Sequence, residues 1–314
     1  MTNQNTQKNN DDFKHYTVML KEATDGLNIK GSNKIFVDAT LGGGGHSKRI
    51  AENLGPNGRL ISFDVDDDAI KKANEVLKDF KNVKIIKDSY TTIPEHLKQM
   101  GIEKITGGII FDLGASYHQL TKAERGFSFM KDAPLDMRFN KEAAFSAYDV
   151  VNTYKEGDLI RIFSEYGEER FSKRIARAII ENRPINTTLQ LADLIKKTVP
   201  KTNSKIHPAT RVFQAIRIEV NNELLNFENT LNRVVKIMGS GAIISIITFH
   251  SLEDRLAKNI LRGFVDTEKK NKFKPQSNNG ILKLINKKPI VASDEELKEN
   301  PPSRSAKLRL AQRI

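Results

Sequence analysis

A run of four glycines, Gly42 to Gly45, stands just after the apolar segment Ile35 to Ala39, which predicts a buried strand. Backbone without side chains at the carboxyl end of a parallel strand lets a nucleotide-like ligand approach the start of the next helix. The dinucleotide fingerprint G-x-G-x-x-G fails here, because Ser47 or Lys48 stands where the third glycine belongs. The run therefore disfavours a nicotinamide cofactor, and a plain flexible turn is the alternative.

Two further positions suit the adenosine part of a ligand. Asp64 follows the apolar segment Leu60 to Phe63, and a carboxylate there can accept hydrogen bonds from both hydroxyls of a ribose. Tyr90 follows the third apolar segment, directly after Asp88 and Ser89, and offers an aromatic face to adenine. The alternative for Asp64 is that it and the next aspartates only cap a helix, with Asp67 as the cap.

The fourth apolar segment, Ile109 to Leu113, brings Asp112 and Ser116 to the place where methyltransferases bind the methionine end of their cofactor. Methylating an aromatic amine is difficult because the lone pair of the nitrogen is delocalised. Polar acceptors must bind the N–H groups while the methyl group is positioned in line. Asp112 and Ser116 have the right chemistry to orient the amine and the sulfonium, so we predict methyl transfer from S-adenosylmethionine. A solvated aspartate beside a turn serine is the alternative.

The fifth strand end is followed by His250 and Ser251, which we expect to help hold the base that carries the amine. A hydrolase triad of His250, Ser251 and Asp254 is disfavoured, because no nucleophile elbow precedes it and triad members normally come from separated segments. A local hydrogen bond is an equally good explanation for His250. The chain has six histidines, none paired at helical spacing, and no cysteine, so we expect no metal in catalysis.

The elements that must position these residues alternate between strands and helices, with helices expected at Ser47 to Leu54, Asp67 to Phe80 and Ile93 to Met100. Right-handed crossovers turn this alternation into a parallel sheet with helices on both faces. We therefore predict an α/β fold, a Rossmann-like class I methyltransferase sheet with an inserted small helical domain. The expected strands are Ile35 to Ala39, Leu60 to Phe63, Val83 to Ile86, Ile109 to Leu113, Ala242 to Phe249 and Lys307 to Ile314.

Three regions divide the chain in this interpretation. Residues 1–13 form a disordered tail, residues 14–120 and 208–314 form the methyltransferase domain, and residues 121–207 form an inserted helical RNA-recognition domain. One long helix is expected from Pro208 to the glycines at 239 and 241. Asp266 to Pro302 reads as a mobile loop with a short strand at Ile281 to Ile285. The helices expected in the insert are Ala147 to Asn152, Glu156 to Tyr166, Ser172 to Asn182 and Leu189 to Val199.

The charge balance favours a polyanionic partner. The chain has 51 Lys and Arg against 39 Asp and Glu, a formal net charge of +12, and nucleic acid is the leading candidate. A generally basic, soluble protein is the alternative. With no cysteine, no leader-like start and no stretch of eighteen apolar residues, we expect a cytoplasmic protein without a membrane span. The basic residues expected to bind phosphates, unless they are only solvated, are Arg138, Lys173, Arg174, Arg177, Lys205 and Arg211.

Several segments together make the chain resemble the bacterial ribosomal RNA small subunit methyltransferase H family. The segments are His15 to Leu20, Gly42 to His46, Ala123 to Met130, Pro134 to Arg138, Tyr166 to Phe171, His207 to Arg211 and Phe249 to Arg255. One departure is Ala115 to Gln119, where the family usually has Val-Ser-Ser-Pro-Gln. The altered segment keeps a non-catalytic RNA-binding or assembly factor as an alternative, beside a nicotinamide oxidoreductase.

The resemblance implies methylation of the N4 amino group of cytosine 1402 in 16S rRNA, within the small ribosomal subunit or its late precursor. A homodimer is compatible with it. We expect Asp112, Ser116, His250 and Ser251 to be the catalytic residues. The residues implied to bind S-adenosylmethionine are Gly44, Gly45, His46, Asp64, Tyr90, Asp112 and Gln119.

Overall fold

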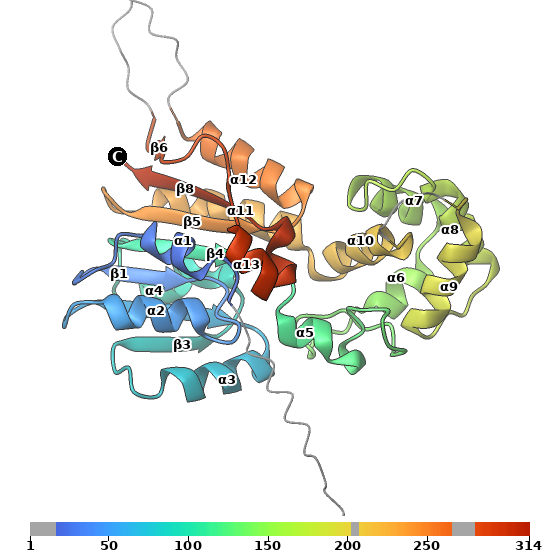
Figure 1. The fold of residues 1–314 in the computed structure, drawn as a ribbon, viewed down its shortest axis with the longest axis horizontal. Coiled ribbons are helices and arrows are strands. Elements are labelled where there is room, and N and C mark those ends of the chain that lie inside the picture. Colours follow the sequence, from blue (N-terminus) through green and yellow to red (C-terminus); the bar gives the residue numbers. More distant parts are fainter. Residues whose placement is uncertain (1–16, 202–206, 266–279) are drawn as a thin grey trace, which may run out of the picture.

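Eight strands form one sheet in the computed structural model, which describes residues 17–201, 207–265 and 280–314. The strand order is β3-β2-β1-β4-β5-β8-β6, and β7 pairs with β8 outside this order. The first five are parallel, whereas β8 runs antiparallel to β5. Figure 1 shows this sheet with its helices as one lobe and a second, helical lobe beside it. The predicted fold class is confirmed.

Three of the parallel strands end on an aspartate, as predicted: β1 (Ile35–Asp38), β2 (Arg59–Asp64) and β4 (Gly108–Asp112). β3 (Val83–Lys87) ends one residue before Asp88. All six residues of β5 (Ile243–Thr248) are buried, as expected for a central strand covered on both faces. Because parallel strands end at the same edge of the sheet, the polar residues that follow them meet there.

Helices cover both faces of the sheet. Apolar side chains of α4 (Ile93–Gln99), α11 (Glu223–Lys236) and α12 (Ser251–Gly263) pack on one face. On the other lie α1 (Leu20–Asp25), α2 (Gly45–Asn53) and α3 (Asp67–Leu77). In the described part of the chain, no helix is both long and apolar enough to cross a membrane.

The helical lobe comprises the described residues between 122 and 221 and has an apolar core of its own. The chain enters it after α5 (Tyr117–Thr121), and its first element is the short helix η2 (Ala123–Arg125). The helices expected here are all present: α6 (Ala147–Thr153), α7 (Glu156–Glu165), α8 (Ser172–Glu181) and α9 (Thr188–Thr198). α10 (Ala209–Asn221) packs into the same core, so packing groups it with the helical lobe.

The prediction of a single long helix after Pro208 is wrong. The segment forms two helices, α10 and α11, which are separated at Asn222. The backbone of Asn222 is left-handed, with φ of 49°. Asparagine tolerates this conformation better than most residues. The apolar spacing continues across the break from Val220 to Leu224, so periodicity alone does not reveal it. The turn sends the chain from the helical lobe back to the sheet.

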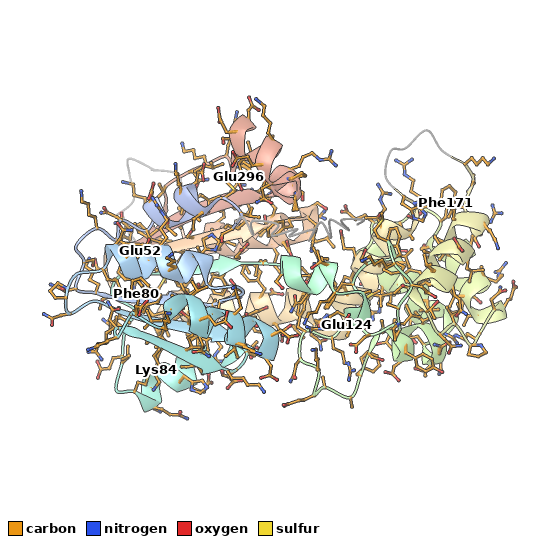
Figure 2. All side chains as sticks on the ribbon, turned by 60° about the horizontal axis from the view of Figure 1, so that its bottom comes forward. Glu52, Phe80, Lys84, Glu124, Phe171 and Glu296 are labelled. Atoms are coloured by element: carbon orange, nitrogen blue, oxygen red, sulfur yellow. The ribbon has the colours of Figure 1, made fainter. Side chains whose placement is uncertain are left out.

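The predicted mobile loop is also wrong for residues 280–302, which are folded. β6 (Leu282–Leu284) and β7 (Ile290–Val291) pair with β8 (Lys307–Arg313), confirming the two C-terminal strand predictions. Between β7 and β8 lie α13 (Asp294–Glu299) and the short helix η3 (Pro301–Ser305). In Figure 2, Glu296 of α13 and Lys84 of β3 lie on opposite sides of the sheet lobe. Residues 266–279 and the predicted tail, 1–13, lie outside the described residues.

Candidate active site

A cavity of about 690 Å³ opens at the carboxyl edge of the sheet, large enough for a nucleoside-sized ligand. Its wall comes from the ends of β1, β2, β4 and β5, from the junction of α10 and α11, and from the C-terminal segment with α13 and η3. The sequence prediction missed this last contribution, because the polar composition of the segment suggested a loop. Its lining residues are Glu299, Asn300, Pro301, Pro302 and Ser305.

The glycine run forms the turn between β1 and α2. Gly42 and Gly44 have positive φ angles of 50° and 83°, which glycine adopts without strain. Gly42, Gly43 and Gly45 line the cavity, whereas Gly44 does not. A Cβ atom on Gly44 would lie 3.3 Å from Ala73 of α3, so its missing side chain allows close packing of this turn on α3. The structure therefore places Gly44 behind the wall of the cavity.

Asp64 lines the cavity and anchors the glycine turn. Its Oδ2 accepts a hydrogen bond of 2.8 Å from the backbone N–H of Gly42, and its Oδ1 accepts one of 2.9 Å from Asp66. Burial raises the pKa of the Asp64 carboxyl. Each carboxylate oxygen has a second lone pair, so both can still accept from a ligand hydroxyl. The predicted helix cap at Asp67 is wrong, because the side chain of Asp66 accepts the capping bond from Asp68.

His46 and Asp112 lie side by side in the cavity wall, with His46 Nδ1 3.6 Å from Asp112 Oδ2. Burial lowers the pKa of His46 to about 4, so the ring is neutral at pH 7. Its Nε2 lies 3.1 Å from the carbonyl oxygen of Val18, a contact in which Nε2 carries the hydrogen. This leaves Nδ1 as an acceptor facing Asp112.

Asp112 is the least satisfied acid of the site. Its Oδ1 is buried and has no hydrogen-bond partner among the described residues. Burial raises its pKa well above the ordinary value, and the neighbouring carboxyls of Asp38 and Glu253 act in the same direction. Burial also raises the pKa of Asp38 to about 6. A desolvated cluster of acids with a free oxygen fits a cationic ligand, such as the sulfonium and ammonium groups of S-adenosylmethionine.

Tyr90 lies in the short helix η1 (Tyr90–Thr92), and its ring contacts Phe111 edge-on at a centroid distance of 6.0 Å. It lines the cavity on the β3 side, together with Asp88 and Ser89. Burial raises the pKa of its hydroxyl, so the ring stays neutral and presents an aromatic surface.

Ser116 and Gln119 both line the cavity and bind each other. The backbone N–H of Ser116 donates to Gln119 Oε1 at 2.9 Å, and the backbone N–H of Gln119 donates to Ser116 Oγ at 3.2 Å. Gln119 Nε2 then donates to Asp66 Oδ2 at 2.8 Å. The loop after β4 is thus closed on itself and fastened to the start of α3. The side chains of Tyr117 and His118 lie outside the described residues.

His250 and Ser251 do not line the cavity. His250 caps α12, with Nδ1 accepting from the backbone N–H of Glu253 at 3.4 Å. Its Nε2 lies 3.0 Å from Glu253 Oε1 but makes no well-directed hydrogen bond with it. The Ser251 hydroxyl donates to Glu168 of the helical lobe at 2.9 Å. At this strand end, Phe249 and Glu253 line the cavity instead.

A buried charge network that the sequence prediction missed completes the wall. Arg217 of α10 donates to both oxygens of Glu223 at 2.8 and 3.0 Å and lies 3.9 Å from Glu253. Ligand atoms of Glu223, His250 and Glu253 lie within 4.8 Å of one another. Arg217 already neutralises Glu223, however, and His250 Nε2 carries the hydrogen because Nδ1 is an acceptor. The geometry favours an ion-pair network over a metal site. One signal of this network was available in the sequence. His250 and Glu253 are three residues apart, the spacing of a capping box, which places Glu253 at the start of α12.

Comparison with known proteins decides the family. The sequence pattern of the MraW methylase family matches residues 12–314. The chain belongs to the MraW methylase family. Ribosomal RNA small subunit methyltransferase H of Clostridium botulinum (strain Loch Maree / Type A3) is 49% identical over 313 residues, covering 96% of this chain and all of that protein. The protein of the same name from Clostridioides difficile (strain 630) is 47% identical over 316 residues, with the same coverage of both chains.

Membership of this family confirms the resemblance found in the sequence. The chain is a methyltransferase, and S-adenosylmethionine is its cofactor. The acidic cavity at the carboxyl edge of the sheet suits such a cationic molecule, with the glycine turn on one side and Asp112 on another. The alternatives of a nicotinamide oxidoreductase and of a non-catalytic factor are thereby set aside.

Proposed function

We propose that the protein methylates the N4 amino group of cytosine 1402 in 16S rRNA, within the small ribosomal subunit or its late precursor. The names of the two relatives support ribosomal RNA of the small subunit as the substrate. The net charge of +12 supports a polyanion. The single observation that carries the chemistry is Asp112, whose buried Oδ1 lacks a partner among the described residues.

The cofactor would lie along the strand ends. Asp64 would bind the ribose hydroxyls, and Tyr90 would contact adenine. Gly45 and His46 would contact the cofactor from the glycine turn, and Gly44 would support that turn by packing on α3. When bound, S-adenosylmethionine supplies a methyl group on a positively charged sulfur. Asp112 would face that charge, and Gln119 would hold the loop that covers it.

The acceptor amine would be oriented by Asp112 and Ser116. Both offer oxygen acceptors in the cavity, so the amine N–H groups can point at them while the nitrogen faces the methyl group. His250 would help to hold the base by positioning Glu253, which lines the cavity, and Ser251 would help by joining α12 to Glu168 of the helical lobe. The cytosine must leave its stack to enter the cavity.

The helical lobe would bind the RNA backbone. Exposed basic residues of α8 lie on this lobe, and Arg211 at the start of α10 is also exposed, whereas Lys205 lies outside the described residues. Arg138 is less available because it pairs with Asp136 at 2.7 Å. We keep the cytoplasm as the expected location and the homodimer as a prediction that sedimentation of the purified protein tests.

RNA mass mapping tests this function. Small-subunit rRNA from a strain lacking the gene should lose one methyl group from the fragment that contains cytosine 1402. The wild-type gene should restore it, and a gene encoding Asp112→Asn should not. A fragment of unchanged mass in the deletion strain contradicts the proposed target. Restoration by Asp112→Asn contradicts the role given to that carboxylate.

A further inference from the structure

We propose that Asp66 and Arg125 are positioning residues whose buried ion pair fixes the loop that carries Ser116 and Gln119, and couples it to the helical lobe. We call these four residues the Asp66 brace. The proposal rests on the functions given above to Ser116 and Gln119. It adds that the shape of their loop is set from outside the cavity, by residues that touch neither the cofactor nor the amine.

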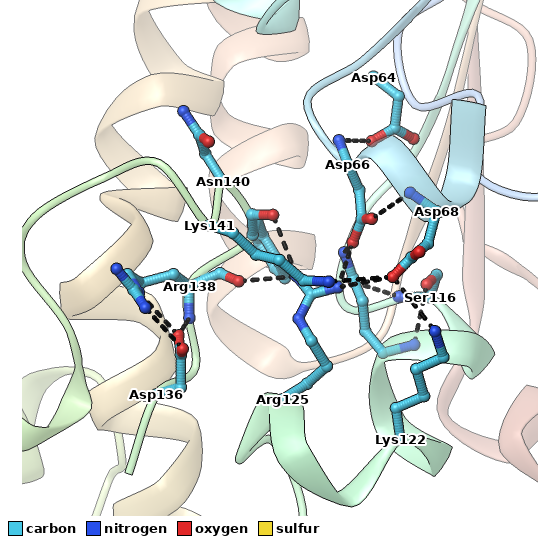
Figure 3. Close-up of polar contacts among 12 residues, drawn as sticks. Asp64, Asp66, Asp68, Ser116, Lys122, Arg125, Asp136, Arg138, Asn140 and Lys141 are labelled. Carbon is cyan, nitrogen blue, oxygen red and sulfur yellow. Dashed lines mark hydrogen bonds and ion pairs between the residues drawn. The ribbon is translucent and has the colours of Figure 1, made fainter. Parts of the chain in front are cut away.

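Asp66 is the centre of the brace. Its side chain and that of Arg125 are each only 2% exposed, and Arg125 Nη1 donates to Asp66 Oδ2 at 2.6 Å. The same oxygen accepts from Gln119 Nε2 at 2.8 Å, while Oδ1 accepts from the backbone N–H of Asp68 at 2.9 Å. Figure 3 shows these contacts converging on Asp66. Neither Asp66 nor Arg125 lines the cavity.

This arrangement determines how Gln119 is oriented. Its amide nitrogen must face the Asp66 carboxylate, so its oxygen faces the backbone N–H of Ser116 and accepts from it at 2.9 Å. The hydroxyl of Ser116 accepts in return from the backbone N–H of Gln119 at 3.2 Å. A carboxylate at position 66 therefore fixes the amide of Gln119, and through it the place of the Ser116 side chain.

The chain of hydrogen bonds continues to the glycine turn. The backbone N–H of Asp66 donates to Asp64 Oδ1, and Asp64 Oδ2 accepts from Gly42. The loop after β4 and the turn after β1 are thus held by neighbouring carboxylates of one segment. Moving Asp66 would disturb both sides of the cofactor cavity together.

Arg125 connects the Asp66 brace to the helical lobe through hydrogen bonds to its backbone. Its Nη2 donates to the backbone oxygens of Arg138 and Phe139 at 2.9 and 3.1 Å, and both of these residues line the cavity. Lys122 and Lys141 support the same junction by pairing with Asp68 at 3.3 and 3.1 Å.

Stability alone is a poor explanation for this pair. A buried ion pair is a weak source of stability, because removing two charges from water offsets most of their attraction. Burial acts to raise the pKa of Asp66, but hydrogen bonds from Gln119 and Arg125 outweigh it and hold that pKa below its usual value. The carboxylate is therefore ionised at neutral pH and available as an acceptor. Such a fixed charge is suited to orienting neighbouring groups.

An exchange of isosteric side chains tests the brace. Asp66→Asn replaces one of the two acceptor oxygens with a donor, so the side chain can no longer accept from both Gln119 and the backbone N–H of Asp68. Gln119→Glu places a second carboxylate against Asp66. The double variant restores a donor and an acceptor between positions 66 and 119 with the two groups exchanged, but Arg125 loses its acceptor oxygen, so the rescue is partial. We expect each single variant to lower kcat about 10-fold and the double variant to recover to within about 5-fold of the wild type. In the cofactor-free protein, hydrogen exchange at Ser116 and Gln119 should speed up in the singles and slow again in the double.

The matched control is a largely buried Arg–Asp pair away from the cavity, Arg309 with Asp254, whose two hydrogen bonds measure 2.7 and 3.1 Å. Asp254→Asn should lower the melting temperature but leave kcat, the affinity for S-adenosylmethionine by calorimetry, and exchange at Ser116 unchanged. If Asp66→Asn behaves like Asp254→Asn in all three readouts, the proposal is overturned. Should Asp66→Asn fail to fold, Gln119→Glu and Arg125→Lys decide by the same readouts.

Failure of the brace and failure of the proposed function can be told apart. Hydrogen exchange in the cofactor-free protein reports the order of the loop whether or not the loop takes part in methyl transfer. If Ser116→Ala keeps full kcat, the function given to Ser116 is wrong, while the exchange data still judge the brace. If Ser116→Ala is inactive and exchange is unaltered in Asp66→Asn, only the brace is wrong.

Discussion

The backbone N–H of Met19 donates a hydrogen bond of 2.8 Å to Oε1 of Glu296, joining residues 277 positions apart. Met19 directly precedes α1, and Glu296 lies in α13 next to the segment that lines the cavity. This contact holds the C-terminal segment against the N-terminal one beside the site. The two ends of the described chain therefore build one side of the cofactor cavity together.

Glu296→Ala should loosen the contact between the N-terminal and C-terminal segments at this side of the cavity. Loss of the bond leaves a buried N–H without its acceptor, so we expect about 1 to 3 kcal/mol less stability and about 10-fold weaker binding of S-adenosylmethionine. Calorimetry and thermal unfolding measure the two effects. The exposed neighbour Glu295→Ala is the control and should change neither. Equal affinity in both variants would show that this contact does not support the cavity.

Asp112→Asn should separate activity from stability. Its carboxyl has a strongly raised pKa because it is desolvated, so a neutral amide removes an unfavourable buried charge. We expect kcat to fall by about 100-fold or more, and the melting temperature of the cofactor-free protein to stay level or rise by a few degrees, roughly the effect of 1 kcal/mol. Methyl transfer to isolated small subunits and calorimetric scans measure these. A variant that loses both properties would mean that Asp112 is primarily structural.

His46 should make stability depend on pH. The unfolded chain binds a proton on this ring below pH 6.5, whereas the folded ring stays neutral down to about 4. Stability is therefore lost as the pH falls through this range, by about 2 kcal/mol between pH 7 and pH 5. His46→Gln does not titrate and can still donate to Val18, so it should lack this loss. Urea unfolding at the two pH values measures the difference, and parallel pH profiles would contradict the buried neutral ring.

Asn222 should tolerate glycine but not alanine. Its left-handed backbone, with φ of 49°, is strained by about 1 kcal/mol for a residue with an ordinary Cβ. We expect Asn222→Gly to unfold at nearly the wild-type urea concentration and Asn222→Ala to be about 1 kcal/mol less stable. The opposite order would mean that α10 and α11 form one continuous helix in solution.

Removing the three exposed basic residues of α8 should weaken RNA binding and its salt dependence. Each phosphate that the protein no longer binds reduces the slope of log affinity against log salt by about 0.7 to 0.9, so three alanines should reduce it by about 2 to 3. Filter binding across a salt series measures the slope. A control removes three exposed lysines at the α3 side of the sheet lobe and should leave it unchanged. The test residues are Lys173, Arg174 and Arg177, and the control residues are Lys71, Lys78 and Lys81.

Much of the sheet and of its polar edge could be predicted from the sequence. Buried parallel strands are short apolar runs, and Asp38, Asp64 and Asp112 each end one of them, so their meeting at one edge follows from topology. The helices of the insert were predictable for a similar reason, because their apolar spacing is regular. These features depend on local pattern alone.

Features that depend on distant contacts could not be predicted. The break at Asn222 is hidden because the apolar positions continue on both sides, although they face different lobes. The C-terminal segment is polar, and its order depends on pairing with β8 and on the bond to Met19. The placing of Ser251 against Glu168, and the burial of Arg217 between two glutamates, likewise depend on how the lobes meet.

The position of β8 in the sheet determines when the edge of β5 can be covered during synthesis of the chain. β8 lies between β5 and β6, and its residue Lys307 is 59 positions from Thr248, its partner in the antiparallel pair. While a ribosome makes this chain, β5 emerges before β8 and can pair only with β4. Its other edge therefore leaves backbone N–H and C=O groups unpaired, next to apolar side chains. That edge stays exposed to other strands until Lys307–Arg313 has emerged. The cofactor site, whose wall includes the residues just before β8, therefore cannot be complete before this part of the chain has emerged.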